Sequence, residues 1–129
     1  MLFAYTILYV ENVSLSLQFY KEAFGFEIKF MSPEGDYGEL ISGATTLAFA
    51  KHSLGESNFK ASYQKAQKGK SPFGIELAFS TENIEADLAK ATAAGAEEFE
   101  PLKEKPWGQK VAYLLDLNGF LIEVCTPMK

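Results

Sequence analysis

The chain has 129 residues, a length that can form one domain with a substantial hydrophobic core. Hydrophobic residues make up 47% of the chain and charged residues 22%, which excludes a disordered, collagen-like or coiled-coil protein. The net charge is −5, and all 12 basic residues are lysines because the sequence contains no arginine. Nucleic acid is therefore not an expected partner, since a basic surface is what neutralises phosphates.

The cysteine content and the apolar segments predict the compartment. A single cysteine, Cys125, cannot form an internal disulfide, and residues 1–10 lack the basic start and cleavage site of a secretory signal. No apolar run approaches the roughly 20 residues of a spanning helix, and no basic amphipathic helix suggests surface attachment. We expect a cytoplasmic protein that does not bind membranes.

The first half of the chain begins with a predicted strand, Phe3–Val10, in which nearly every residue is apolar or β-prone, as in a strand covered on both faces. Asn12 is a predicted cap for the helix Ser14–Phe24, and Gly25 ends it. A short strand, Phe26–Phe30, follows. The apolar positions of the helix are Leu15, Leu17, Phe19, Tyr20 and Ala23.

The same order recurs in the second half, where residues 75–80 alternate as a strand, Asn83 caps the predicted helix Ile84–Ala93, and Gly95 ends it. Each half then continues with two strands joined by a tight turn. These are Tyr37–Ile41 and Thr45–Lys51 with the turn Ser42-Gly43, and Gln109–Leu115 and Phe120–Thr126 with the turn Asp116–Gly119. The first half therefore reads as βαβββ, and we interpret the second half as a repeat of the same module.

The repeat predicts one domain over residues 1–129, with module one at about 1–52, a connector at about 53–72 and module two at about 73–127. The connector is polar, and its four lysines are more typical of a solvated face than of a binding patch. We predict a helical turn near Ser62–Lys68. Because the connector is longer than most loops, it could help to cover a site.

The chain resembles the vicinal oxygen chelate superfamily, which includes glyoxalase I, extradiol dioxygenases and bleomycin-resistance proteins. The resemblance covers the whole chain and rests on short motifs in a fixed order. They are Tyr5-x6-Asn12, Phe19-Tyr20, Phe24-Gly25-Phe26, Glu76-x6-Asn83, Trp107-Gly108, Asp116-Leu117-Asn118-Gly119 and Ile122-Glu123-Val124. The resemblance implies an α+β fold whose two βαβββ modules form a cupped, mixed eight-stranded sheet with the helices outside. It also implies a homodimer whose cup holds a small molecule, often over a divalent metal.

The metal ligands of the superfamily correspond here to Tyr5, Ala48, Glu76 and Glu123, of which only the two glutamates are plausible ligands. The only histidine, His52, lies four residues beyond Ala48, and we expect it at the surface or the rim. Two histidines and a carboxylate therefore cannot be assembled. We expect no cofactor and no tightly bound zinc or iron, although a hard divalent ion could bind at Glu76 and Glu123.

Glu76 and Glu123 each lie within an apolar strand, where an ionised carboxylate is costly unless it is paired or solvated. If both face one cup, their repulsion should raise at least one pKa and favour a cation or a shared proton. The alternative without a functional role is that both glutamates are solvated on an open sheet face. The other candidate ligand-binding residues are Tyr5, Ala48, Phe49, Trp107 and Tyr113, although each aromatic residue taken singly is also typical of a core.

The sequence favours a small-molecule binding protein that sequesters an apolar or cationic ligand in an aromatic, carboxylate-bearing cup. One alternative is a divalent-metal-dependent glyoxalase-like lyase, isomerase or dioxygenase, and another is an interaction module with a vestigial cup. No catalytic residue is assigned, because no base lies beside Cys125 to activate its thiol. The chain also lacks a phosphate-binding glycine loop, a Cys-x-x-Cys pair and any arginine to bind phosphate or glutathione.

Overall fold

The computed structural model describes residues 1–128 and has an α+β fold built from two compact units, Met1–Lys65 and Ala66–Lys129. Each unit carries one βαβββ module, as the repeat predicts, and its strands form a four-stranded mixed sheet of their own. The boundary between the units falls inside the predicted connector. Within the described residues, no helix is long and apolar enough to cross a membrane.

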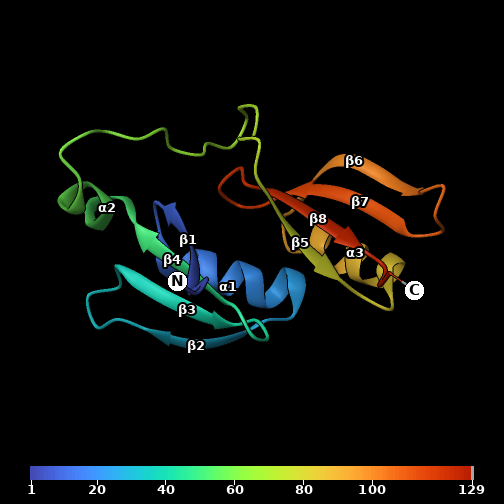
Figure 1. Ribbon diagram of the computed structural model, residues 1–129, viewed down its shortest axis with the longest axis horizontal. Coiled ribbons are helices and arrows are strands. Elements are labelled where there is room, and N and C mark those ends of the chain that lie inside the picture. Colours follow the sequence, from blue (N-terminus) through green and yellow to red (C-terminus); the bar gives the residue numbers. More distant parts are fainter. Residues whose placement is uncertain (129) are drawn as a thin grey trace. The chain divides into compact units, whose positions relative to one another are not determined.

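The first unit forms a sheet with the strand order β1-β4-β3-β2 (Figure 1). Strand β1 runs parallel to β4, and the other neighbouring strands are antiparallel. The elements are β1 (Tyr5–Val10), α1 (Val13–Phe24), β2 (Glu27–Met31), β3 (Tyr37–Ile41), β4 (Thr46–Lys51) and α2 (His52–Asn58).

The second unit repeats this arrangement with the strand order β5-β8-β7-β6. Strand β5 runs parallel to β8, and the remaining pairs are antiparallel. The elements are β5 (Glu76–Ser80), α3 (Ile84–Ala93), β6 (Glu97–Glu104), β7 (Lys110–Leu115) and β8 (Leu121–Cys125). The equivalent order of strands makes positions in the two sheets directly comparable.

Helix α1 has the predicted cap and end, and it begins at Val13, one residue before the predicted start. The side chain of Asn12 accepts a hydrogen bond from the backbone N–H of Leu15 at 2.9 Å, and Gly25 adopts φ = 77°, which favours glycine. The prediction that Leu15 lies on the apolar face is wrong, because Leu15 is exposed while Ser16 is buried. The helical period explains this, since Ser16 and Leu17 follow Val13 by three and four residues and share its face.

Helix α3 has the predicted bounds, but its start differs from the prediction. The Asn83 side chain makes no capping hydrogen bond. Instead, the Thr81 hydroxyl accepts a hydrogen bond from the backbone N–H of Asn83 at 3.0 Å and donates one to the Asp87 carboxylate. Threonine provides the same kind of oxygen acceptor as asparagine, two residues earlier in the chain.

The core of each unit lies between its sheet and the helix that covers one sheet face (Figure 1). In the first unit, the ring of Phe49 is fully buried 4.9 Å from that of Tyr20 on α1. Gly38 faces the same helix, and a Cβ there would lie only 2.6 Å from the Leu17 side chain. In the second unit, Ile122 and Ile84 are buried.

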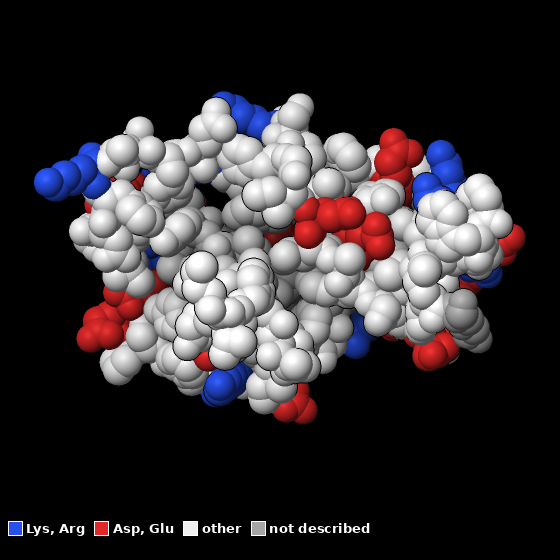
Figure 2. Space-filling view, viewed as in Figure 1, with Lys and Arg blue, Asp and Glu red and all other residues white. Residues whose placement is uncertain are grey.

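The opposite face of the first sheet is open. Strand β1 begins at Tyr5 rather than Phe3, and Tyr5 and Ile7 are exposed, so the prediction of a strand covered on both faces is wrong. Phe30 and Ile41 are also exposed, on β2 and β3. Figure 2 shows that uncharged residues cover most of the face in view and that charged groups are scattered over it. An apolar side chain exposed in this way remains available for contacts.

The connector is helical at its start. The predicted helical turn at Ser62–Lys68 is wrong, since the described structure has no helix there and α2 occupies residues 52–58 instead. The connector covers one end of β1, because the rings of Phe59 and Tyr63 lie 6.1 and 5.1 Å from that of Tyr9. Gly55 permits this approach, since a Cβ there would lie 2.7 Å from the Tyr9 ring.

The β7–β8 turn is held by a buried carboxylate. Asp116 accepts hydrogen bonds from the backbone N–H groups of Asn118 and Phe120, at 2.9 and 2.8 Å. Gly119 completes the turn with φ = 91°. The equivalent turn of the first unit contains Gly43 and the half-buried Ser42, whose hydroxyl donates a hydrogen bond to the Thr45 carbonyl.

Candidate functional site

The open face of the second sheet brings two carboxyl groups together. The strand register aligns Ala78, Glu123 and Tyr113 across β5, β8 and β7, and Glu76 lies two residues before Ala78 on the same face. The Tyr113 hydroxyl donates a hydrogen bond to Glu123 at 3.1 Å. Burial raises the pKa of Glu76, and the charge of Glu123 together with a hydrogen bond between the two side chains raises it further. These groups form the candidate site.

A chain of hydrogen bonds continues from the candidate site along the same sheet. Burial raises the pKa of the Cys125 thiol, and a hydrogen bond to Glu123 adds to this effect, so the thiol stays protonated. Gln109 also contacts Cys125 and donates a hydrogen bond to the Thr126 carbonyl at 2.8 Å. The Trp107 indole N–H in turn donates to the Gln109 side chain at 2.9 Å.

Trp107 lies in the β6–β7 turn, and 64% of its surface is exposed. It lines a pocket of about 510 Å³ together with the start of α3 and the end of β8. The pocket is lined by Glu82, Ile84, Glu85, residues 107–110 and residues 126–128. Glu76, Tyr113 and Glu123 do not line it, so Trp107 is placed apart from the carboxyl pair.

The three candidates from the first unit do not share one face. Tyr5 is 53% exposed on β1, and the buried Ala48 lies beside Ile7 and Glu39 on the same face. Phe49 points to the opposite side, where it is fully buried against Tyr20. Phe49 therefore lies in the core and not on the face of Ala48, because side chains of neighbouring strand residues alternate between faces.

Sequence reasoning missed Glu39, the partner of Ala48 across the strands. Glu39 is only 7% exposed, and its carboxylate accepts a 2.7 Å hydrogen bond from the Tyr37 hydroxyl. Lys29 contributes an ion pair at 3.7 Å. Burial raises the pKa of Tyr37, and Glu39 raises it further. The signal in the sequence was the Tyr-x-Glu spacing, which places both side chains on one strand face.

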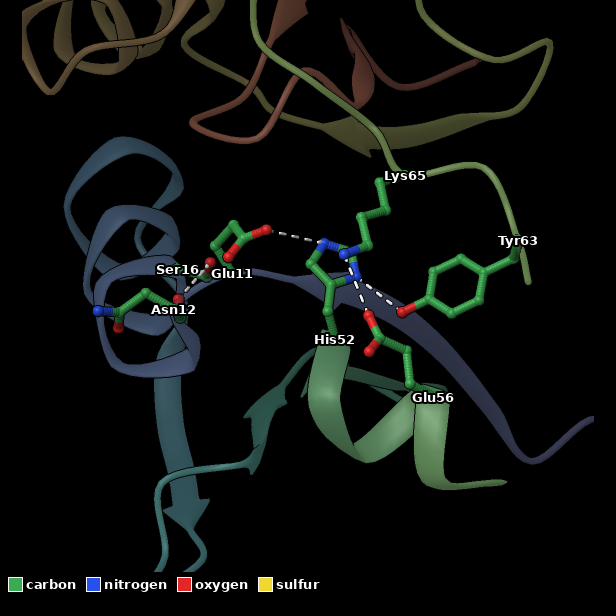
Figure 3. A network of polar contacts seen from close by, with 7 residues as sticks. All are labelled: Glu11, Asn12, Ser16, His52, Glu56, Tyr63 and Lys65. Atoms are coloured by element: carbon green, nitrogen blue, oxygen red, sulfur yellow. Dashed lines mark hydrogen bonds and ion pairs between the residues drawn. The ribbon is translucent and has the colours of Figure 1, made fainter. Parts of the chain in front are cut away.

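The prediction that His52 lies at the surface or the rim is wrong, because His52 is only 5% exposed. Its Nδ1 lies 2.7 Å from the Tyr63 hydroxyl, and its Nε2 lies 3.9 Å from Glu11 (Figure 3). Burial lowers the pKa of His52, and the nearby Lys65, which pairs with Glu56 at 3.1 Å, lowers it further. His52 thus connects the start of α2 to Tyr63 and Glu11.

The residues of this protein do not fit the metal centre that is typical of the vicinal oxygen chelate superfamily. Of the four corresponding positions, Ala48 has no donor atom and Glu76 and Glu123 supply carboxylates. Across residues 1–128, no group of three or more His, Cys, Asp or Glu side chains is arranged to hold a metal ion. The two carboxylates and the one phenol at these four positions do not provide the nitrogen and sulfur ligands that zinc and iron sites use.

The two βαβββ modules define the class of protein as the vicinal oxygen chelate fold. The family model for a glyoxalase-like domain matches residues 3–129, and the chain belongs to this family. No curated protein matches the chain in sequence.

Solved structures show the same fold. A protein of unknown function from Agrobacterium tumefaciens is 26% identical with a TM-score of 0.78, over 98% of this chain and 94% of that one. A glyoxalase-related enzyme from Fulvimarina pelagi is 18% identical with a TM-score of 0.82, over 98% and 88%. A glyoxalase/bleomycin resistance protein/dioxygenase family enzyme from Burkholderia phytofirmans is 21% identical with a TM-score of 0.73, over 95% of both chains.

Proposed function

We propose that this protein binds a small cationic molecule with a flat apolar part, and that Glu76 and Glu123 are the anionic centre of the site. The observation that carries the proposal is the carboxyl pair on the open face of the second sheet. Burial and then the charge of Glu123 raise the pKa of Glu76, and a bound cation would relieve the repulsion between the two carboxyl groups. A bound positive charge would therefore stabilise the two carboxylates in their ionised form.

The surroundings of the pair support the same ligand class. Tyr113 fixes one oxygen of Glu123 and offers an aromatic ring beside the charge. Aromatic faces attract cations, by roughly 0.5–1 kcal/mol at exposed sites. The chain has no arginine and a net charge of −5, so little positive charge is available to bind an anionic ligand. We propose a homodimer as the assembly in which the ligand is bound.

Titration calorimetry with benzyltrimethylammonium as the probe tests the proposal. Benzyl alcohol and benzoate carry the same ring without charge and with negative charge, and the parent protein should bind the cation most tightly. Glu76→Gln and Glu123→Gln should each weaken binding of the cation by about fivefold or more, because each substitution keeps the side-chain volume and removes a charge. Glu98→Gln, an exposed carboxylate on β6, is the matched control and should bind like the parent. Equal affinity of all variants for the cation, or tighter binding of benzoate, would refute the proposal.

Native mass spectrometry of protein purified without chelator separates this proposal from its alternatives. We expect a dimer that acquires the organic cation at millimolar concentration and retains no stoichiometric transition metal. Retained metal that is lost in both glutamine variants would favour a metal-dependent enzyme instead. A protein that binds neither a cation nor a metal would favour an interaction module.

A further inference from the structure

Residues 59–65, which we call the strap, are held against the rest of the first unit mainly by Tyr63. The strap forms neither helix nor strand, and Tyr63 is half-buried whereas its other residues are exposed. The Tyr63 ring lies 5.1 Å from that of Tyr9 and 6.2 Å from that of Phe59. Its hydroxyl lies 2.7 Å from Nδ1 of His52. A segment outside helices and strands depends on such side-chain contacts for its position.

The partner of the Tyr63 hydroxyl has a fixed place in the fold. His52 is the first residue of α2 and directly follows the last residue of β4, so its backbone is tied to the sheet. Its ring is buried and lies 5.7 Å from that of Tyr63. Glu11 faces Nε2 and favours the tautomer that carries its proton there, which leaves Nδ1 to accept the Tyr63 hydroxyl proton.

Protonation of His52 removes this acceptor and places a charge in a buried position. An imidazolium has two N–H donors and no acceptor, so Nδ1 can no longer accept a proton from the Tyr63 hydroxyl. A buried charge is costly unless it is paired or solvated. Tyr63 is the neighbour that can leave, because the strap lies outside helices and strands, and its departure would open the imidazolium to water.

The charged neighbours of His52 do not compensate the buried imidazolium (Figure 3). Glu11, after β1, and Glu56, on α2, favour the charged form of His52, whereas Lys65, on the strap, opposes it. Glu56 already pairs with Lys65 at 3.1 Å, and the Glu11 side chain is 82% exposed, so solvent screens its attraction. Burial and Lys65 therefore lower the pKa of His52. Burial raises the pKa of Tyr63, so its phenol stays neutral.

We propose that the His52–Tyr63 contact is an acid-sensitive latch, and that protonation of His52 releases the strap and uncovers Tyr9. Tyr9 and Tyr5 share a face of β1, because strand residues alternate between faces. The strap therefore covers the Tyr9 end of the open face of the first sheet. The latch goes beyond the proposed function, since it lies in the first unit and uses no residue of the carboxyl pair.

Nuclear magnetic resonance of the intact protein from pH 8 to 4.5 tests the latch without any substitution. His52 is the only histidine, so its ring protons give a single set of signals that report its titration. We expect a midpoint below 6.5, and the nuclear Overhauser effect between the Tyr9 and Tyr63 rings should be lost with the same midpoint. Backbone relaxation should show increased motion of the strap in acid, while the signals of Tyr113 in the second unit stay unchanged.

Two outcomes of the pH series would overturn the latch. One is a contact between the Tyr9 and Tyr63 rings that persists after His52 has titrated. The other is loss of this contact together with the Tyr113 signals, because that result would mean unfolding of the whole chain.

Two variants assign the release to His52 and Tyr63. Tyr63→Phe keeps the ring and removes the hydroxyl, so its strap should already be mobile at pH 8 and His52 should titrate closer to 6.5. His52→Gln does not titrate, and its strap should behave alike at both ends of the pH range. Lys60→Gln, an exposed position of the strap, is the matched control and should behave like the parent. A strap that still detaches in acid in His52→Gln would refute the assignment of the latch to His52.

Discussion

The open faces of the two sheets have equivalent positions but different chemistry. Tyr5 and Glu76 each lie seven residues before the asparagine that precedes a helix, and Ala48 and Glu123 occupy the same place in β4 and β8. Glu39 on β3 corresponds to Tyr113 on β7, because each is the cross-strand partner of that position. The first unit thus keeps its carboxylate one strand away from where the second unit has Glu123.

The carboxylates of the two open faces differ in how far their charge is compensated. In the first unit, Lys29 and the Tyr37 hydroxyl already compensate Glu39. In the second unit, Glu123 faces another carboxyl group, and Tyr113 is the only hydroxyl donor seen on it in the described structure. The two modules therefore share an apolar covered face, which must pack against a helix. They differ on the open face, which has no such constraint.

The largest expected effect tests the covered face of the first unit. Phe49→Ala should lower the free energy of unfolding by about 3–5 kcal/mol, because it leaves a cavity beside Tyr20 in a site that solvent does not reach. Urea unfolding followed by circular dichroism measures this loss. Tyr5→Ala on the open face is the control and should cost far less. Equal losses would mean that the two faces are equally packed.

The turns test a second difference between the units. Asp116→Ala should cost about 1.5–3 kcal/mol, because it removes a buried charged acceptor from two backbone N–H groups. Ser42→Ala in the equivalent turn should cost about 0.5–1 kcal/mol, since it removes one neutral hydrogen bond from the half-buried Ser42 hydroxyl to the Thr45 carbonyl. Both values come from urea titrations at pH 7. A larger loss for Ser42→Ala than for Asp116→Ala would contradict the conclusion that the second unit has the more strongly held turn.

Acid should destabilise the first unit through His52. The pKa of His52 is lowered from 6.5 in the folded protein, so the unfolded chain binds more protons once the pH falls below about 6.5. The free energy of unfolding should therefore decrease from pH 6.5 downward until the lowered pKa has been passed. Parallel urea titrations of the parent and His52→Gln from pH 8 to 4.5 should show that the variant loses this part of the slope. Identical slopes would show that His52 titrates normally.

The smallest expected effect concerns the carboxyl pair and has the opposite sign. The pKa of Glu76 is raised above 4.5, so the folded protein binds this proton more tightly than the unfolded chain, and stability falls as the pH rises through that range. Glu76→Gln should therefore raise the melting temperature slightly at pH 7 and leave it unchanged at pH 3.5. Differential scanning calorimetry, with Glu98→Gln as the control, measures this. Benzyltrimethylammonium should raise the melting temperature of the parent more than that of Glu76→Gln at pH 7, because the variant binds the cation more weakly.

Several site residues could be located from the sequence because strand alternation is a local property. The spacing of Glu76 before Asn83 and of Glu123 after Gly119 supported the family resemblance that singled out these two residues, and the strand register places them on one face of the second sheet. The same alternation should have separated Phe49 from Ala48, since neighbouring residues of a strand face opposite sides. Glu39 was overlooked because its role depends on Lys29, which belongs to another strand.

The amino-acid sequence by itself determined the duplicated βαβββ order, the bounds of α3 and the capping of α1 by Asn12, because periodicity and capping act over a few neighbouring residues. Only the tertiary structure decided that Leu15 is exposed, that His52 is buried beneath Tyr63, and that Trp107 lines a pocket with the start of α3. These outcomes depend on which segments meet across long stretches of chain, and no local pattern encodes those contacts.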